Sequence, residues 1–277
     1  MPIENSDASM PVSSENVVAT ANELGSPGPM SFALAAIAFV PGLAFGSFLN
    51  VVAARVPRKR SIVSPGSACM SCGAELAWYD NLPVVSYLLL RGRCRGCGTK
   101  IGLVYPAIEL VAALLVAACF LVFGLSGDAV VASFFCLTRV TVSATDHAHR
   151  IVPNVVVLPA AVVVLVAQTV LHPSVEWALG AFGASFFLFL AALAYPAGMG
   201  MGDVKLALLL GAMLGRTVPV ALMVGMIAAL VPSIVLFIRH GSKARKMGIP
   251  FAPFLALGGI VALFFGDDLL DAYLNLL

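Results

Sequence analysis

Residues 105–124 read YPAIELVAALLVAACFLVFG and carry a single charged side chain, Glu109. An apolar run of about 20 residues is the length that crosses the hydrocarbon core of a bilayer as a helix. Comparable runs recur from Met30 to Phe265, broken by short stretches that carry Gly, Pro or charge. The sequence therefore predicts a protein that passes through a membrane several times.

The composition of the chain leads to the same class. Of its 277 residues, 60% are hydrophobic and only 11% are charged, with a mean hydropathy of +1.00. Soluble domains are about half apolar and about a quarter charged, so a soluble protein is excluded. No segment alternates with period two, as a membrane barrel requires. We expect an all-α polytopic membrane protein.

The apolar runs divide the chain into about eight transmembrane helices. The predicted segments are 30–53, 105–124, 129–145, 155–171, 177–195, 204–215, 217–238 and 250–265. Residues 1–29 are polar, acidic and Ser-rich, and we expect a disordered tail there. The domains are then this tail, the first transmembrane helix at 30–54, a small Cys-rich module at 55–104, and a helical membrane bundle at 105–277.

The lysines and arginines predict the orientation of the chain. Eight of the 16 lie between Arg55 and Lys100, and four more lie between Arg239 and Lys246. Cytoplasmic loops carry an excess of Lys and Arg, which places both stretches in the cytoplasm and the N-terminus outside. Arg216 fits this topology poorly.

The module at 55–104 contains two CxxC motifs, Cys69 with Cys72 and Cys94 with Cys97, and 21 residues lie between the second and third cysteine. Four thiolates suit tetrahedral zinc, and nearby glycines supply the tight turns of such motifs. A module of about 50 residues buries little core and usually needs a metal or disulfides to hold its fold. We expect a structural zinc ion there.

Other readings of the cysteines remain open. A cytoplasmic location argues against disulfides, and a thioredoxin-like redox site would be expected within a βαβ pattern that is not present. Unmetallated thiols are the remaining alternative. Cys119 and Cys136 lie in apolar runs, where a free cysteine usually acts as a small hydrophobic residue, so we assign them no chemistry.

Asp203 ends the run GMGMGD at residues 198–203 and begins an apolar helix. Acidic residues at a membrane edge are costly and are functional candidates by default. Gly200 and Gly202 permit another backbone to approach closely, which suits a site that holds an extended peptide beside a carboxylate. The structural alternative is that Asp203 simply caps the helix after a flexible loop.

Asp146 follows another apolar run and lies at the same predicted membrane depth as Asp203. Alone, it would read as a solvated loop residue that pairs with Arg150. Two carboxylates at one depth suggest an aspartyl pair instead. Such a pair shares one proton, activates water on a peptide carbonyl and protonates the leaving amine.

Three further interpretations concern neighbouring residues. Asp146, His147 and His149 are acceptable metal ligands, although their spacing does not suit a helical site such as HExxH. Glu109 either positions the substrate or the amine, or it extends to the interface and pairs with an Arg. Lys205 either neutralises an acidic substrate side chain or extends to the interface in the same way.

At these residues the sequence resembles the bacterial type IV prepilin peptidases, the bifunctional leader peptidase and N-methyltransferase family of GxGD aspartyl proteases. The similarity covers nearly the whole chain after the tail. Matching motifs are GSFLNVV at 46–52, RVP at 55–57, YDNLP at 79–83, SY at 86–87, LRGRCRGC at 90–97, YPAIE at 105–109, Asp146 with Pro153 and Asn154, GMGDVKL at 200–206, and PFAPF at 250–254. Ala252 stands where the family more often has Gly.

This resemblance implies cleavage of the leader of prepilins or pseudopilins by Asp146 and Asp203 at the cytoplasmic face of the bacterial inner membrane. It also implies N-methylation of the new N-terminal residue with S-adenosylmethionine, by the module. The chain has no glycine-rich nucleoside-binding fingerprint, so the sequence places no cofactor ligands. We expect the lipid bilayer and the prepilin as partners, and no nucleic acid; the sequence does not fix the oligomeric state.

Two other functions remain open from the sequence. One is a peptidase without methyltransferase activity, in which the zinc module only stabilises the fold or docks the leader. The other is a non-enzymatic membrane transporter or scaffold, in which the intramembrane acids relay protons or bind ions.

Overall fold

The computed structural model describes residues 28–194, 199–241 and 250–276. These ranges contain helices, turns and two isolated β-bridges, and no strand within them is longer than a bridge. The predicted all-α class is therefore confirmed. The expected tail lies almost entirely outside the described residues.

Each of the eight expected membrane segments corresponds to a helix in the described part of the chain. The helices are α2 (Pro29–Arg55), α4 (Val104–Phe123), α5 (Gly127–His149), α6 (Asn154–Leu171), α7 (Glu176–Ala194), α8 (Met201–Leu214), α9 (Val218–His240) and α10 (Ala252–Leu274). Seven stretches of the described residues are long and apolar enough to cross a membrane, and one of them, Met201–His240, comprises α8, α9 and the short helix η3 (Gly215–Thr217) between them.

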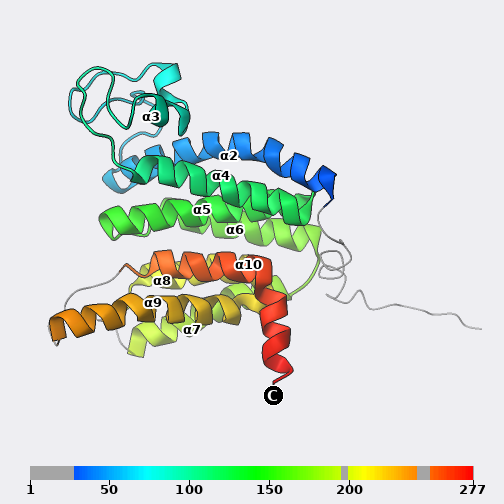
Figure 1. Ribbon diagram of the computed structural model, residues 1–277. Coiled ribbons are helices and arrows are strands. Elements are labelled where there is room, and N and C mark those ends of the chain that lie inside the picture. Colours follow the sequence, from blue (N-terminus) through cyan, green and yellow to red (C-terminus); the bar gives the residue numbers. More distant parts are fainter. Residues whose placement is uncertain (1–27, 195–198, 242–249, 277) are drawn as a thin grey trace, which may run out of the picture.

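Turns and helix ends follow the local sequence. Gly215 has a φ of +50°, a left-handed conformation that suits glycine, and the chain turns there from α8 into α9 (Figure 1). Two helices extend beyond the predicted apolar runs: α5 continues through Asp146, and α10 ends at Leu274 rather than near residue 265. An apolar run sets the length that lies in lipid, whereas polar residues such as Asp268 are tolerated in a helix that continues outside it.

Small residues allow the helices to pack closely. Gly42 and Gly46 of α2 face α4, where an added Cβ would lie 2.7 Å from Cα of Ala113 and 2.6 Å from Cα of Glu109. Glycines four residues apart are typical of helix pairs in membranes, because their backbones can approach each other directly. The α2–α4 pair therefore holds the two helices that flank the module in a fixed register.

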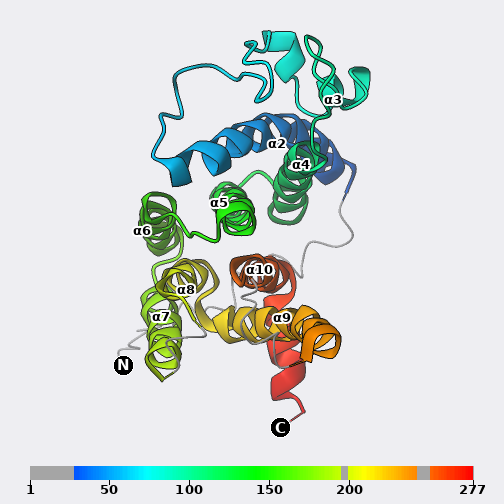
Figure 2. The same ribbon diagram turned by 90° about the vertical axis from the view of Figure 1, so that its left-hand side faces the viewer.

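The helices form layers that are seen end-on in Figure 2. The module lies at the top of that view, followed by α2 with α4, then α5 with α6, then α8 with α10, and finally α7 with α9. Helix α8 is central, and from Leu209 to Leu214 every residue is buried. Asp203 in its first turn is thus anchored to the best-packed helix of the bundle.

The module between α2 and α4 contains only short elements. They are η1 (Val56–Arg58), η2 (Trp78–Asn81) and α3 (Val85–Leu89), together with the bridges Ala68–Glu75 and Arg93–Lys100. The predicted small Cys-rich unit between the first two membrane helices is confirmed. Figure 1 shows it beside α2, at the end of the bundle where α5 ends and α6, α8 and α10 begin.

Candidate active site and cysteine cluster

Asp146 lies in the last turn of α5 and is buried, with 7% of its surface exposed. Its Oδ2 accepts a hydrogen bond from the backbone N–H of Ala252 at 3.2 Å, in the first turn of α10. The helix ends at Arg150, which has a left-handed φ of +54°. No ion pair joins Asp146 to Arg150 among the described residues, so the solvated-loop interpretation of Asp146 is not supported.

Asp203 lies in the first turn of α8, whose N-cap is Gly200. Its backbone N–H donates to the carbonyl of Gly200 at 3.1 Å. The side chain of Asp203 therefore does not cap the helix, and the simple capping interpretation is not supported. Gly198 lies outside the described residues, as does most of the loop before it.

Several contacts bring the ends of four helices together around the two carboxylates. A Cβ on Gly202 would lie 2.9 Å from Cβ of Val152, so the first turn of α8 rests directly on the segment after α5. Lys205 Nζ donates to Oδ1 of Asn154, the first residue of α6, at 2.8 Å. Asp146 and Asp203 are close enough for their charges to interact.

This arrangement gives the carboxylates an unusual electrostatic environment. The N-terminal ends of α6, α8 and α10 meet there (Figure 1), and helix N-termini carry a partial positive charge that favours anions. Burial excludes water and strengthens every interaction with a developing charge. The arrangement suits a reaction that uses an ionised carboxylate as a base.

Arg139 was not selected as a site residue from the sequence, although an arginine inside an apolar run is itself a signal. It lies on α5 two turns before Asp146, about 10 Å along the helix axis. Only 1% of its surface is exposed, and no nitrogen of its guanidinium has a hydrogen-bond partner in the described structure. The group lies over the ring of Phe135, 5.8 Å from its centroid, and its charge reaches Asp203.

Two of the expected alternatives are clarified by the positions of His147 and Glu109. His147 is exposed, whereas its neighbour Asp146 is buried. The one group of candidate metal ligands among the described residues is formed by the four cysteines, so a metal site at Asp146, His147 and His149 is not supported. Glu109 is buried, and its Oε2 accepts from the backbone N–H of Val84 at 2.8 Å. Within the described structure it pairs with this amide rather than with an arginine.

The four cysteines of the module converge. Their Sγ atoms all lie within 4.8 Å of one another, and those of Cys69 and Cys97 are 3.8 Å apart. A tetrahedron with Zn–S bonds of about 2.3 Å has edges of about 3.8 Å, so the cluster fits a zinc ion in size and donor type.

Each CxxC motif adopts the same turn. Cys69 N–H donates to Ala74 O and Gly73 N–H to Cys69 O, each at 2.9 Å. The second motif repeats both bonds at the same lengths, from Cys94 N–H to Thr99 O and from Gly98 N–H to Cys94 O. Gly73 and Gly98 have left-handed φ values of +72° and +70°. The repeated geometry positions two pairs of sulfur atoms against each other.

Thr99 favours the thiolate form of Cys97. Oγ1 of Thr99 lies 3.3 Å from its Sγ, and this hydroxyl, followed by the backbone N–H of Thr99, lowers the pKa of Cys97 to about 6. A thiolate is the form that binds metal. Cys119 and Cys136 are fully buried in the helical bundle, apart from this cluster.

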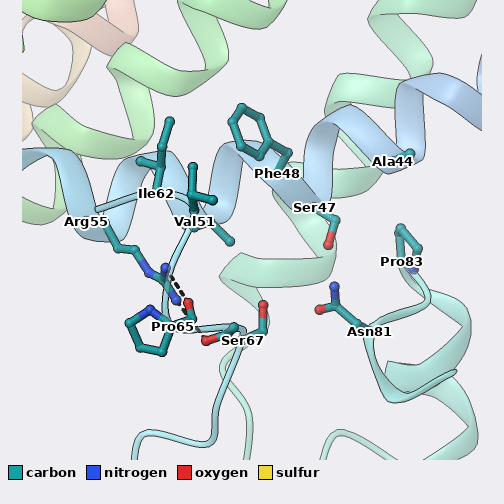
Figure 3. Close-up of a pocket in the computed structure, with 12 residues that line it drawn as sticks. Ala44, Ser47, Phe48, Val51, Arg55, Ile62, Pro65, Ser67, Asn81 and Pro83 are labelled. Atoms are coloured by element: carbon teal, nitrogen blue, oxygen red, sulfur yellow. Dashed lines mark hydrogen bonds between the residues drawn. The ribbon is translucent and has the colours of Figure 1, made fainter. Parts of the chain in front are cut away.

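A cavity of about 340 Å³ lies between α2 and the module (Figure 3). Its apolar side includes Phe48, Val51 and Ile62, and Ser47 and Asn81 add polar groups. The guanidinium of Arg55 donates hydrogen bonds at 2.8–3.1 Å to three backbone carbonyls of the 61–66 loop, so it is not free to bind a ligand in the cavity. The arginine therefore fixes the wall of the cavity. No sequence pattern indicated this cavity.

Comparison with known proteins divides the chain into two matched regions. Residues 40–123 match the bacterial peptidase A24 N-terminal domain, and residues 133–237 match the type IV leader peptidase family. Both Asp146 and Asp203 fall in the second region, and the four cysteines of the CxxC motifs fall in the first.

Individual relatives match along most of their length. A prepilin leader peptidase/N-methyltransferase of Bacillus subtilis is 34% identical over 87% of this chain and 98% of its own. One of Pseudomonas aeruginosa is 33% identical over 89% of this chain and 95% of its own. No solved structure matches the chain.

Proposed function

This chain belongs to the type IV leader peptidase family, and we propose that Asp146 and Asp203 form its catalytic pair. The protein is an integral membrane protease with N-methyltransferase activity: it cleaves the leader peptide of prepilin-like proteins and methylates the new N-terminal residue. The assignment of the pair depends on one observation: the ends of four helices converge on Asp146 and Asp203. Asp146 is buried, and its carboxylate accepts a hydrogen bond from the backbone N–H of Ala252.

The pair acts with one proton between its two members, because two neighbouring carboxylates do not both ionise readily. The ionised member takes a proton from water, and the resulting hydroxide oxygen bonds to the scissile carbonyl carbon while the protonated member gives its proton to the carbonyl oxygen. When the C–N bond breaks, the carboxyl that took a proton from water gives it to the amine, and the other carboxylate takes back the proton from a hydroxyl of the gem-diol as the carbonyl re-forms. The helix N-termini of α6, α8 and α10 stabilise the negative charge that the carboxylate pair carries during the reaction.

The substrate leader reaches the pair from the cytoplasmic side. The basic residues between Arg55 and Lys100 and between Arg239 and Lys246 favour this orientation, with the N-terminus outside. Arg216, the exception to that rule, is paired with Asp267 at 2.8 Å, which reduces its weight in setting the topology. Lys205 is held by Asn154, so its role is to position the start of α8.

The four cysteines hold a structural zinc ion. Sulfur spacing and the repeated turns support this assignment. Metal binding would supply the folding free energy that so small a module lacks in its core. The cysteines belong to the module between α2 and α4, whereas the aspartates lie on α5 and α8, so the zinc takes no part in cleavage.

The cavity between α2 and the module holds the methyl donor, S-adenosylmethionine. Ligand sites of about 300–1,000 Å³ with mostly apolar walls and a few polar groups are typical for molecules of this size. Phe48 and Ile62 offer an apolar surface, Ser47 and Asn81 offer hydrogen bonds, and the Glu109 carboxylate lies within reach of Ser47. The donor supplies an electrophilic methyl group, and these residues bind and orient it.

A cavity-filling variant tests this site. Val51→Trp is expected to abolish binding of S-adenosylhomocysteine in a titration while leaving peptide cleavage intact. Ile37→Trp, at an exposed position on the same helix, is the control and should bind normally. Normal binding by Val51→Trp would place the donor elsewhere.

The whole function is tested in one reaction. Purified protein is incubated with a prepilin-like peptide, with and without S-adenosylmethionine, and the products are weighed by mass spectrometry. We expect cleavage in both reactions and a methyl mass increase only with the donor. Cleavage without methylation would leave a peptidase alone, and no cleavage would contradict the assignment.

A further inference from the structure

Helix α3 exposes large apolar side chains although it belongs to the polar part of the chain. The exposed fractions of Leu88 and Leu89 are 69% and 77%, and that of Trp78, in the preceding short helix, is 79%. If the module were surrounded by water, these three apolar side chains would be solvated. Exposed clusters of this kind mark interaction or membrane surfaces.

The depth of α3 is fixed by its first hydrogen bond. Val84, the N-cap of α3, donates its N–H to Glu109, which lies five residues inside α4. Glu109 in turn contacts Gly46, which lies nine residues before the end of α2. At 1.5 Å per residue, Cα of Glu109 lies about 8 Å inside α4 and Cα of Gly46 about 14 Å inside α2, and α3 begins within the length of the Glu109 side chain from that level.

At this level α2 and α4 also expose apolar side chains, including Phe45 and Leu110. Figure 1 shows the module beside α2 rather than beyond its end. The apolar side chains of α3 therefore lie at the same depth as helix surfaces that face lipid. Basic residues follow directly, since Arg91 and Arg93 are exposed after the end of α3.

We propose that α3 lies in the interface of the lipid bilayer, with Leu88 and Leu89 among the outer acyl segments and Trp78 at the level of the headgroups. Arg91 and Arg93 then meet the anionic headgroups, which attract cations near the membrane surface. Apolar residues next to Trp and basic residues are the composition of interfacial segments. Lipid contact holds the module against the bundle and orients the cavity mouth toward the membrane surface. This inference goes beyond catalysis and does not depend on it.

Tryptophan fluorescence tests the contact directly. Trp78 and Trp177 are the two tryptophans of the chain. The variant W78F/W177F with Leu89→Trp is reconstituted in phosphatidylcholine–phosphatidylglycerol vesicles whose acyl chains are brominated near the headgroup. The matched control carries Met70→Trp in the same background, because Met70 is equally apolar and 81% exposed but lies in the first cysteine turn. Circular dichroism verifies that both variants fold.

We expect a blue-shifted emission at position 89 that the brominated chains quench at least twofold more than at position 70. Red-shifted emission quenched by aqueous iodide would show that α3 faces water. Blue-shifted emission without bromine quenching would show that a protein surface, such as a second copy, covers it. Either of these results, or equal bromine quenching at both positions, would overturn the proposal.

Discussion

Oδ2 of Asp146 accepts a hydrogen bond from the backbone N–H of Ala252 at 3.2 Å, which connects the last turn of α5 to the first turn of α10. The two residues are 106 positions apart in sequence. Because the helices around them are closely packed, the carboxylate is held in place before any substrate binds. Such preorganisation lets the pair act without reorganising at the moment of reaction.

The pair predicts a characteristic pH dependence. At low pH both carboxyls are protonated and no base remains, whereas at high pH both are ionised and no acid remains. The profile of kcat/KM, measured with a peptide that lacks titratable groups, should therefore be bell-shaped, with both apparent values belonging to the pair. A rate that stays flat across this range would argue for another mechanism.

Gly202 predicts a positional effect on catalysis. Its Cβ would lie 2.9 Å from Cβ of Val152, so Gly202→Ala should push the first turn of α8 away from α5 and lower kcat about 10- to 100-fold. Adding Val152→Gly, which removes both the Cβ and the Cγ2 that would lie 2.9 Å from the new methyl group, should restore part of the loss. Gly183→Ala, where nothing lies within 4 Å, is the control and should leave kcat unchanged. Unaltered turnover in Gly202→Ala would contradict the close contact.

The cysteine cluster predicts one zinc ion per chain, measured by elemental analysis of the purified protein. Replacing Cys69, Cys72, Cys94 and Cys97 by Ser should remove the metal and, with it, methylation, because binding and folding of the module are coupled. Cleavage should survive, with a raised KM if the module also docks the leader. Equal zinc content or equal methylation in the four-Ser variant would disprove the metal-held module.

Arg139 predicts opposite effects on stability and activity. A buried charge without a partner is costly, so Arg139→Met should raise the unfolding temperature in detergent, corresponding to about 1–4 kcal/mol. The same variant should lose activity, because the positive charge that reaches Asp203 is gone. Arg139→Lys, which keeps the charge, should retain more of the activity. A less stable Arg139→Met variant would show that the side chain serves packing instead.

The sequence predicted where the helices of this fold lie better than it predicted the residues at which they end. Apolar runs located the eight helices, since lipid demands long uninterrupted hydrophobic segments. The extension of α5 through Asp146 was missed because polar residues at a helix end resemble a loop. The two CxxC motifs located the cysteine cluster, because their spacing encodes a local turn.

Other parts of the site depend on contacts between distant segments and leave little trace in one sequence. The bond from Val84 to Glu109 and the cavity beside Arg55 arise only when the module folds back onto α2 and α4. Arg139 is visible as an arginine in an apolar run, but the absence of a hydrogen-bond partner for it among the described residues follows from the packing around it.

The most direct test of the catalytic pair compares wild-type protein with Asp146→Asn and Asp203→Asn in the cleavage of a prepilin-like peptide. The amide keeps the shape of the side chain but cannot shuttle a proton. Both variants should insert in the membrane and bind S-adenosylhomocysteine normally, yet cleave at least about 1,000-fold more slowly, a loss of about 4 kcal/mol in transition-state stabilisation. Near-normal cleavage by either variant would contradict the account.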